Sequence, residues 1–161
     1  MGNRIRTSPR RTRRRLAAAV AGAVMAAVPA AAWAHAVFVS HSSVPANTDQ
    51  KLAFNVPEEK GPDLHNSKIV FVVPAGFSVS GCDAKSQWAC NVAPASGGRT
   101  TVTYTRSSGT DPDGHFGFGV HTPGQRGDYP FNTIQTYSDN STVRWDGPPD
   151  SDTPAPVLKV T

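Results

Sequence analysis

The chain has 161 residues, with 16 lysines and arginines, 12 acidic residues and two cysteines. Seven of the arginines lie within residues 2–15, so the part from residue 35 onward has 16 − 7 = 9 basic against 12 acidic residues and a net charge near −3. Without a basic cluster, that part lacks the electrostatic surface that nucleic-acid binding requires. Composition therefore excludes a nucleic-acid partner.

The first 34 residues have the organisation of a signal peptide. Residues 2–15 are basic and contain no acid, residues 16–32 are mostly Ala, Val, Leu and Met, and Ala32-Trp33-Ala34 matches an A-x-A cleavage site. The alternative is a membrane anchor, but the apolar run contains Pro29 and is at the short edge of the roughly 20 residues that a span needs. We therefore predict a signal peptide over residues 1–34 and cleavage before His35.

Export places the protein outside the cytoplasm, either secreted or in the cell envelope. The segment Thr12-Arg13-Arg14-Arg15-Leu16 could be a twin-arginine signal or simply the basic region of a Sec signal. The chain ends at Val160-Thr161 with no further apolar stretch, so we expect no transmembrane helix in the mature protein.

Cleavage would make His35 the first residue of the mature chain. Its α-amine and its imidazole Nδ1 can then close a chelate ring around a metal, and because the pKa of a free α-amine is only about 7.7 to 8, a metal can displace that proton near neutral pH. These two nitrogens would fill two positions of the tetragonal N/O geometry that Cu(II) prefers.

The 161 − 34 = 127 residues that remain suit a single domain, residues 35–161. Apolar residues alternate along several short segments separated by Gly- and Pro-rich turns, which predicts half-buried strands. About nine such strands favour an all-β, antiparallel β-sandwich. The predicted strands are 37–40, the segment around Leu52-Phe54-Val56, 69–73, 77–80, the segment around Val102-Tyr104, 115–120, 131–137, 142–145 and 156–160.

Cys82 and Cys90 are the only cysteines. In an oxidising compartment an even pair most simply forms a disulfide. A copper thiolate is the alternative.

Few other residues suggest chemistry. Glu58 and Glu59 follow Pro57 at a strand end and could supply an oxygen ligand or simply be exposed. His115 and His121 share one face of a predicted strand with two glycines, whereas His41 and His65 are expected at the surface. Trp145 ends a predicted strand, a position typical of core or interface.

Several segments together resemble the exported YcnI-type copper-binding domain. They are the start His35-Ala36-Val37, the segment 54–60, the run Gln135-Thr136-Tyr137-Ser138-Asp139 with Arg144-Trp145, and the segment 154–158. The resemblance implies a β-sandwich of the immunoglobulin or cupredoxin-like type. It also implies a Cu(II) site made by the N-terminal histidine, His35, with a glutamate best matched by Glu59, Glu58 being the reserve, and with Trp145. Because indole has only an N–H donor, Trp145 would cover the ion or fix the histidine ring.

The sequence thus predicts a non-enzymatic, extracytoplasmic Cu(II)-binding protein acting in copper acquisition, storage or delivery, with a membrane copper transporter or a copper chaperone as a possible partner. One alternative is a copper enzyme of the polysaccharide monooxygenase type, for which His115 or His121 would supply a second histidine. Another is a metal-free interaction module of the cell surface.

Overall fold

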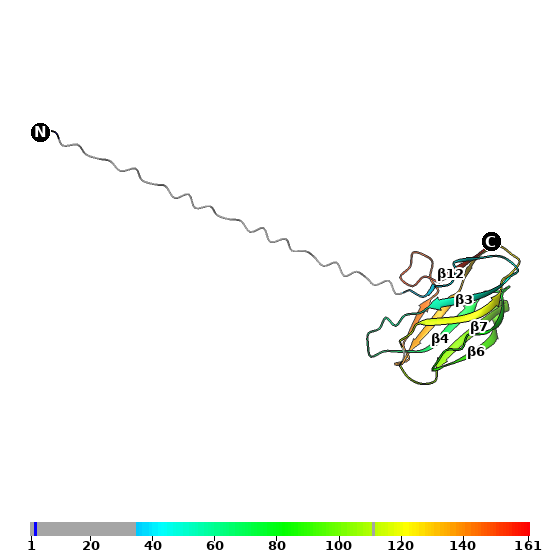
Figure 1. Ribbon diagram of the computed structural model, residues 1–161, viewed down its shortest axis with the longest axis horizontal. Coiled ribbons are helices and arrows are strands. Elements are labelled where there is room, and N and C mark those ends of the chain that lie inside the picture. Colours follow the sequence, from blue (N-terminus) through cyan, green and yellow to red (C-terminus); the bar gives the residue numbers. More distant parts are fainter. Residues whose placement is uncertain (1, 3–34, 111) are drawn as a thin grey trace. The chain divides into compact units, whose positions relative to one another are not determined.

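The computed structural model describes residue 2, residues 35–110 and residues 112–161 (Figure 1); the predicted signal peptide and its cleavage site lie outside the described residues. The described part is built from strands and one short 3-10 helix, Ser96–Gly98. None of its helices is long and apolar enough to cross a membrane. The strands are β1 (Val37–Phe38), β2 (Ser43–Val44), β3 (Asp49–Asn55), β4 (Asn66–Val73), β5 (Ser78–Cys82), β6 (Trp88–Ala95), β7 (Arg99–Arg106), β8 (His115–His121), β9 (Gly127–Pro130), β10 (Asn132–Tyr137), β11 (Thr142–Trp145) and β12 (Val157–Val160).

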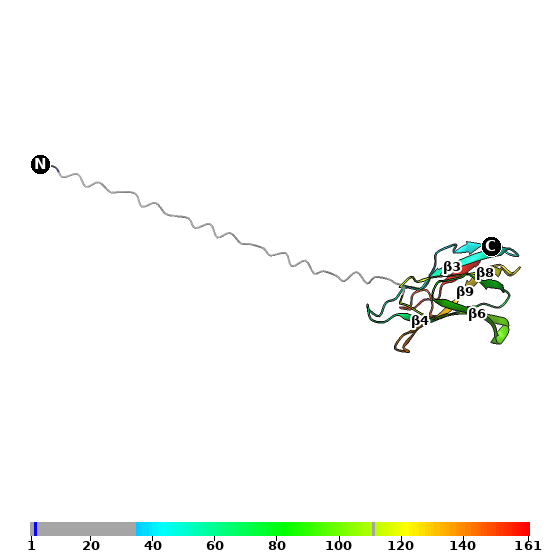
Figure 2. The same cartoon turned by 60° about the horizontal axis from the view of Figure 1, so that its bottom comes forward.

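Two antiparallel sheets form a sandwich, so the all-β prediction is confirmed. The four-stranded sheet has the order β1-β3-β8-β5, and the five-stranded sheet has the order β11-β10-β4-β7-β6. Figure 2 shows β3 and β8 in one layer and β4 and β6 in the other. A small third sheet, β2-β12-β9, contains the parallel pair β2 and β12.

The core lies between the two sheets because alternate residues of each strand point inward. Phe54 of β3, Phe118 of β8 and Phe71 of β4 are fully buried. The Phe54 ring lies 4.5 Å from Phe71 and 5.3 Å from Phe118, centroid to centroid. Each such side chain stabilises the fold by about 1.5 to 3 kcal/mol relative to an exposed one.

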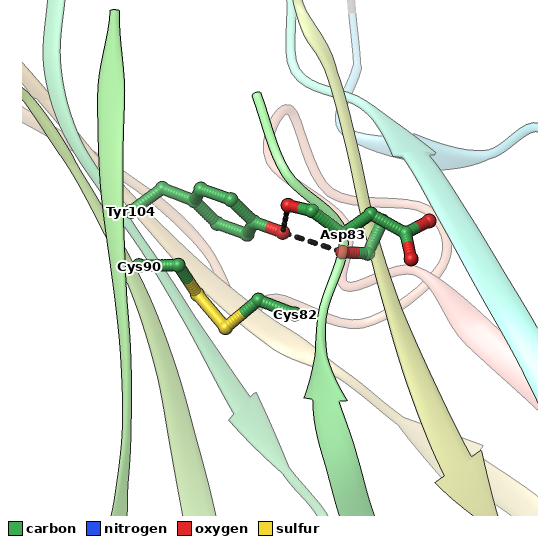
Figure 3. The surroundings of a disulfide bond; sticks show 5 residues. Cys82, Asp83, Cys90 and Tyr104 are labelled. Carbon is green, nitrogen blue, oxygen red and sulfur yellow. Dashed lines mark hydrogen bonds between the residues drawn. A yellow bond between two sulfur atoms is a disulfide. The ribbon is translucent and has the colours of Figure 1, made fainter. Parts of the chain in front are cut away.

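One open side of the sandwich is closed by a disulfide. Cys82 in β5 is bonded to Cys90 in β6, and these two strands are outer strands of the two sheets. Beside this bond the Tyr104 hydroxyl from β7 donates to the carbonyl oxygens of Asp83 and Gly117, as Figure 3 shows. The predicted disulfide is therefore confirmed, and the alternative of a copper thiolate is wrong because both sulfurs are bonded to each other.

The opposite side is closed by aromatic rings. β1 and β11 are the other two outer strands of the sheets. Phe38 of β1 packs edge-on against Phe131, which precedes β10, with centroids 5.4 Å apart. His35, two residues before β1, meets Trp145 at the end of β11.

Three strands were not predicted. β6 contains Pro94 and exposes Val92, so its alternation is weak; this is tolerated because β6 is an outer strand that pairs only with β7. β9 begins at Gly127 and has four residues, and β2 has only two residues. Both pair with β12 rather than with the main sheets.

Candidate metal centre

His35 lies at the side of the sandwich where β1 and β11 are the outer strands. Its side chain is partly buried, and its ring lies edge-on against Trp145, with centroids 5.7 Å apart and an angle of 63° between the ring planes. The imidazole is thus ordered against a large apolar surface and does not project freely into solvent.

Trp145 is buried, with 1% of its surface exposed. It is the last residue of β11, where it pairs with Thr133 of β10. Its indole Nε1–H donates to Oε1 of Gln135 over 3.0 Å. Because the indole nitrogen already donates this hydrogen bond, Trp145 contacts the His35 ring through its ring carbon atoms.

Glu59 belongs to the segment that leaves β3 through Pro57. Its backbone N–H donates to the hydroxyl of Tyr137 over 3.2 Å. Partial burial raises the pKa of the Glu59 carboxyl, and the charge of His35 lowers it. The net effect is a raised pKa, although the residue as a whole is exposed at the surface of the domain.

Glu58, the reserve candidate, has a different environment. Only 10% of its side chain is exposed. One carboxylate oxygen accepts from the backbone N–H of Asn66 over 2.6 Å and lies 3.3 Å from Nη2 of Arg106, and the other lies 3.0 Å from Nδ1 of His65. Its oxygens are occupied by these groups, so it stabilises the loop before β4. His65, expected at the surface, keeps 28% of its side chain exposed and contacts Glu58.

The remaining histidines lie elsewhere. His41 is exposed. His115 and His121 lie on the outer face of β8 together with its two glycines, as the alternation predicted. Nδ1 of His115 is 2.6 Å from Asp113, and Nδ1 of His121 is 2.8 Å from Asp49. The hydrogen bonds from Lys85 and His115 outweigh the effect of burial and hold the pKa of the Asp113 carboxyl well below its usual range.

Chelation by several side chains is not available in the part of the chain that the structure describes, because no three His, Cys, Asp or Glu side chains there are grouped to hold a metal ion. A metal at this place would depend on nitrogen atoms of His35, supplemented by one carboxylate. Such a donor set fits Cu(II), which accepts nitrogen and oxygen ligands and can retain water.

Gln135 and Asn66 were not singled out from the sequence. Both are buried polar residues, and Nε2 of Gln135 donates to Oδ1 of Asn66 over 2.8 Å. Gln135 shares the inward face of β10 with Thr133 and Tyr137. The alternation of apolar residues in 131–137 could have identified Gln135, because it predicts that this amide side chain points into the core.

Comparison with known proteins gives a family match and a fold match. The sequence model of a family described as "Domain of unknown function (DUF1775)" matches residues 35–160. No curated protein sequence gives a significant match.

Two solved structures share the architecture. The crystal structure of an uncharacterized protein from Nocardia farcinica, described as having an immunoglobulin-like fold, is 22% identical, with a TM-score of 0.65 over 79% of this chain and 98% of that one. A cohesin module from a Clostridium perfringens ATCC13124 family 33 glycoside hydrolase is 9% identical, with a TM-score of 0.57 over 79% of this chain and 94% of that one. The prediction of an immunoglobulin-like sandwich is confirmed; at these identities the likeness concerns the fold alone.

Proposed function

The chain belongs to the DUF1775 family, and on that premise we propose that it is an extracytoplasmic protein that binds one Cu(II) ion at His35. Its role would be copper acquisition, storage or delivery, without catalysis. The resemblance to YcnI-type copper-binding domains supports this choice of metal.

The observation that carries the proposal is the contact of the His35 ring with Trp145, with the Glu59 carboxyl within electrostatic range of His35. The His35 ring rests edge-on against the indole at 5.7 Å, and the Glu59 carboxyl is close enough for its pKa to respond to the His35 charge. These three residues come from segments far apart in the sequence. This arrangement supports a site made of an imidazole, a carboxylate and a hydrophobic cover.

Each residue has a distinct role in the proposed site. After cleavage before His35, its α-amine and Nδ1 would chelate the ion, and Glu59 would supply an oxygen ligand and offset positive charge. Trp145 would limit water access and fix the orientation of the imidazole, since its own nitrogen is bonded to Gln135. Outer groups of this kind commonly tune metal affinity.

So small a set of protein donors leaves coordination positions to water. A ligand from another protein can replace water there, so an ion can be handed over without first leaving into solvent. A membrane copper transporter or a copper chaperone is the kind of partner that this exchange suits.

The decisive experiment compares three forms of the domain. One begins at His35, one begins at His35 with its α-amine acetylated, and one begins with alanine through His35→Ala. We expect the first to bind one Cu(II) with a nitrogen-rich tetragonal electron paramagnetic resonance spectrum, and the other two to lose that spectrum, because the chelate needs both the free amine and the ring.

A matched control is His41→Ala, which removes an exposed histidine six positions further along the chain and should leave binding unchanged. Mass spectrometry of the exported protein should find His35 at the N-terminus. Unchanged copper affinity in the acetylated form would overturn the proposal.

A further inference from the structure

Gln135 is a fully buried amide in the middle of β10. Glutamine is seldom completely buried, and a buried amide is tolerated only when its donors and acceptor are paired. Aliphatic residues would fill this position in a sandwich core without needing partners. The presence of an amide there therefore requires a reason other than packing.

The amide makes three hydrogen bonds to separate parts of the chain. Oε1 accepts from Nε1 of Trp145 over 3.0 Å, and Nε2 donates to the Pro57 carbonyl and to Oδ1 of Asn66, each over 2.8 Å. The direction of the amide is fixed by its neighbours, because an indole N–H can only donate and a carbonyl can only accept. Only an amide of this length supplies both kinds of group here.

These bonds connect the strand end that contacts His35 with the segment that carries Glu59. Trp145 forms the indole surface, and Pro57 begins the segment that carries Glu59. Asn66 supports the same segment, since its Nδ2 donates to the carbonyl of Val56 over 3.2 Å. Gln135 thus holds the end of β11 and the exit of β3 at a fixed separation.

We propose that Gln135 is a positioning residue for the copper site, an inference that rests on the proposed function. It sets the orientation of Trp145 and the path of the Pro57–Glu59 segment before any ion is present. An ion arriving at His35 then meets a cover and a carboxylate already in place, so binding does not have to order them.

The test uses Gln135→Met, which preserves size and removes all three bonds, and Gln135→Asn, which keeps a neutral amide that is too short to reach its three partners together. Both variants are made in the domain that begins at His35. The matched control is Thr122→Val. Thr122 is also fully buried, and its hydroxyl bonds to Pro45 and Thr48 at the far end of β3 from Pro57.

Two measurements are made on each variant. In the metal-free protein, the indole N–H signals of Trp88 and Trp145 are followed by nuclear magnetic resonance, and Cu(II) affinity is then measured by competition with a chelator. We expect the Trp145 signal to shift and to exchange faster in both Gln135 variants, the Trp88 signal to stay, and copper affinity to fall by about tenfold or more. Thr122→Val should change neither.

The outcomes separate this inference from the proposed function. If the original domain takes up no copper, the proposed function fails, and the Trp145 signal still reports whether Gln135 orients the indole. If the original domain binds copper and a folded Gln135 variant binds it equally well, the positioning role is wrong. Gln135→Asn retains a polar core residue, so the comparison stands even where Gln135→Met does not fold.

Discussion

Glu58 and Glu59 are neighbours in the chain but act on different parts of the molecule. The Glu58 carboxylate is enclosed by Asn66, His65 and Arg106, whereas the Glu59 carboxyl interacts electrostatically with His35. Glu58 therefore stabilises a loop, and Glu59 is the carboxylate that responds to the charge of His35.

The first prediction separates these two carboxylates. Glu59→Gln should lower Cu(II) affinity by about 10- to 100-fold and change the free energy of unfolding by no more than about 0.5 kcal/mol, as expected for an exposed position. Glu58→Gln should cost about 2 kcal/mol of stability, because hydrogen bonds to a buried charge are lost, and should leave copper affinity nearly unchanged. Urea unfolding and chelator competition give the two quantities. The reverse pattern would make Glu58 the ligand.

The second prediction concerns the indole. Trp145→Phe removes the donor to Gln135 and shrinks the surface against His35, so we expect weaker Cu(II) binding by about tenfold. Trp88→Phe is the matched control, since Trp88 is also buried but packs against Phe116 and Arg106. Equal losses of copper affinity in the two variants would point to a general loss of stability as the cause.

The third prediction concerns the disulfide. Replacing Cys82 and Cys90 by alanine should lower the free energy of unfolding by about 2.5 kcal/mol, the chain-entropy value for so short a loop. Copper affinity should remain, because the bond lies on the opposite side of the sandwich from His35. Thermal unfolding with and without a reductant checks the first value, and a copper titration checks the second. Loss of Cu(II) binding in the folded double-alanine variant would contradict this prediction, because it would show that the disulfide side of the sandwich contributes to the site.

The fourth prediction concerns alkaline pH. Burial, reinforced by the negative charge of Asp83, raises the pKa of Tyr104 to about 12, against about 10 in an unfolded chain. Because the folded pKa is the higher one, the stabilising contribution is complete below about pH 10 and is lost as the pH rises through about 12.

Absorbance of tyrosinate at alkaline pH should show late ionisation, and Tyr104→Phe should remove the part near pH 12. Late ionisation of Tyr137, whose pKa is also raised by burial, should remain in this variant. The stability difference between the original protein and this variant should shrink over the same pH interval. A difference that stays constant up to pH 12 would show that Tyr104 does not have this pKa in the folded state.

Much of the fold could be predicted because alternation reports directly which face of a strand is buried. Phe116, Phe118 and Val120 on one face of β8, and His115 and His121 on the other, lie as their sequence positions indicated. β6 could not be predicted in this way. As an outer strand it buries few side chains, and its pattern is correspondingly weak.

The candidate site was only partly accessible from sequence. The resemblance selected His35, Glu59 and Trp145, and the chain brings the ring of Trp145 against that of His35. The amide of Gln135 could not be foreseen, because its importance depends on three partners that the sequence separates widely. Local patterns identify buried positions, but they do not tell which long-range hydrogen bonds occupy them.

The two open sides of the sandwich differ in how they are fastened. Cys82 and Cys90 join β5 to β6 covalently, while β1 approaches β11 through contacts such as that of His35 with Trp145. Local opening therefore costs less free energy at the β1 margin than at the β5 margin. Such local opening would move His35 away from Trp145 and release a bound Cu(II) ion while the core stays folded. Conversely, a bound ion would stabilise the closed form of the edge formed by β1. Copper binding and the opening of this edge are then linked equilibria.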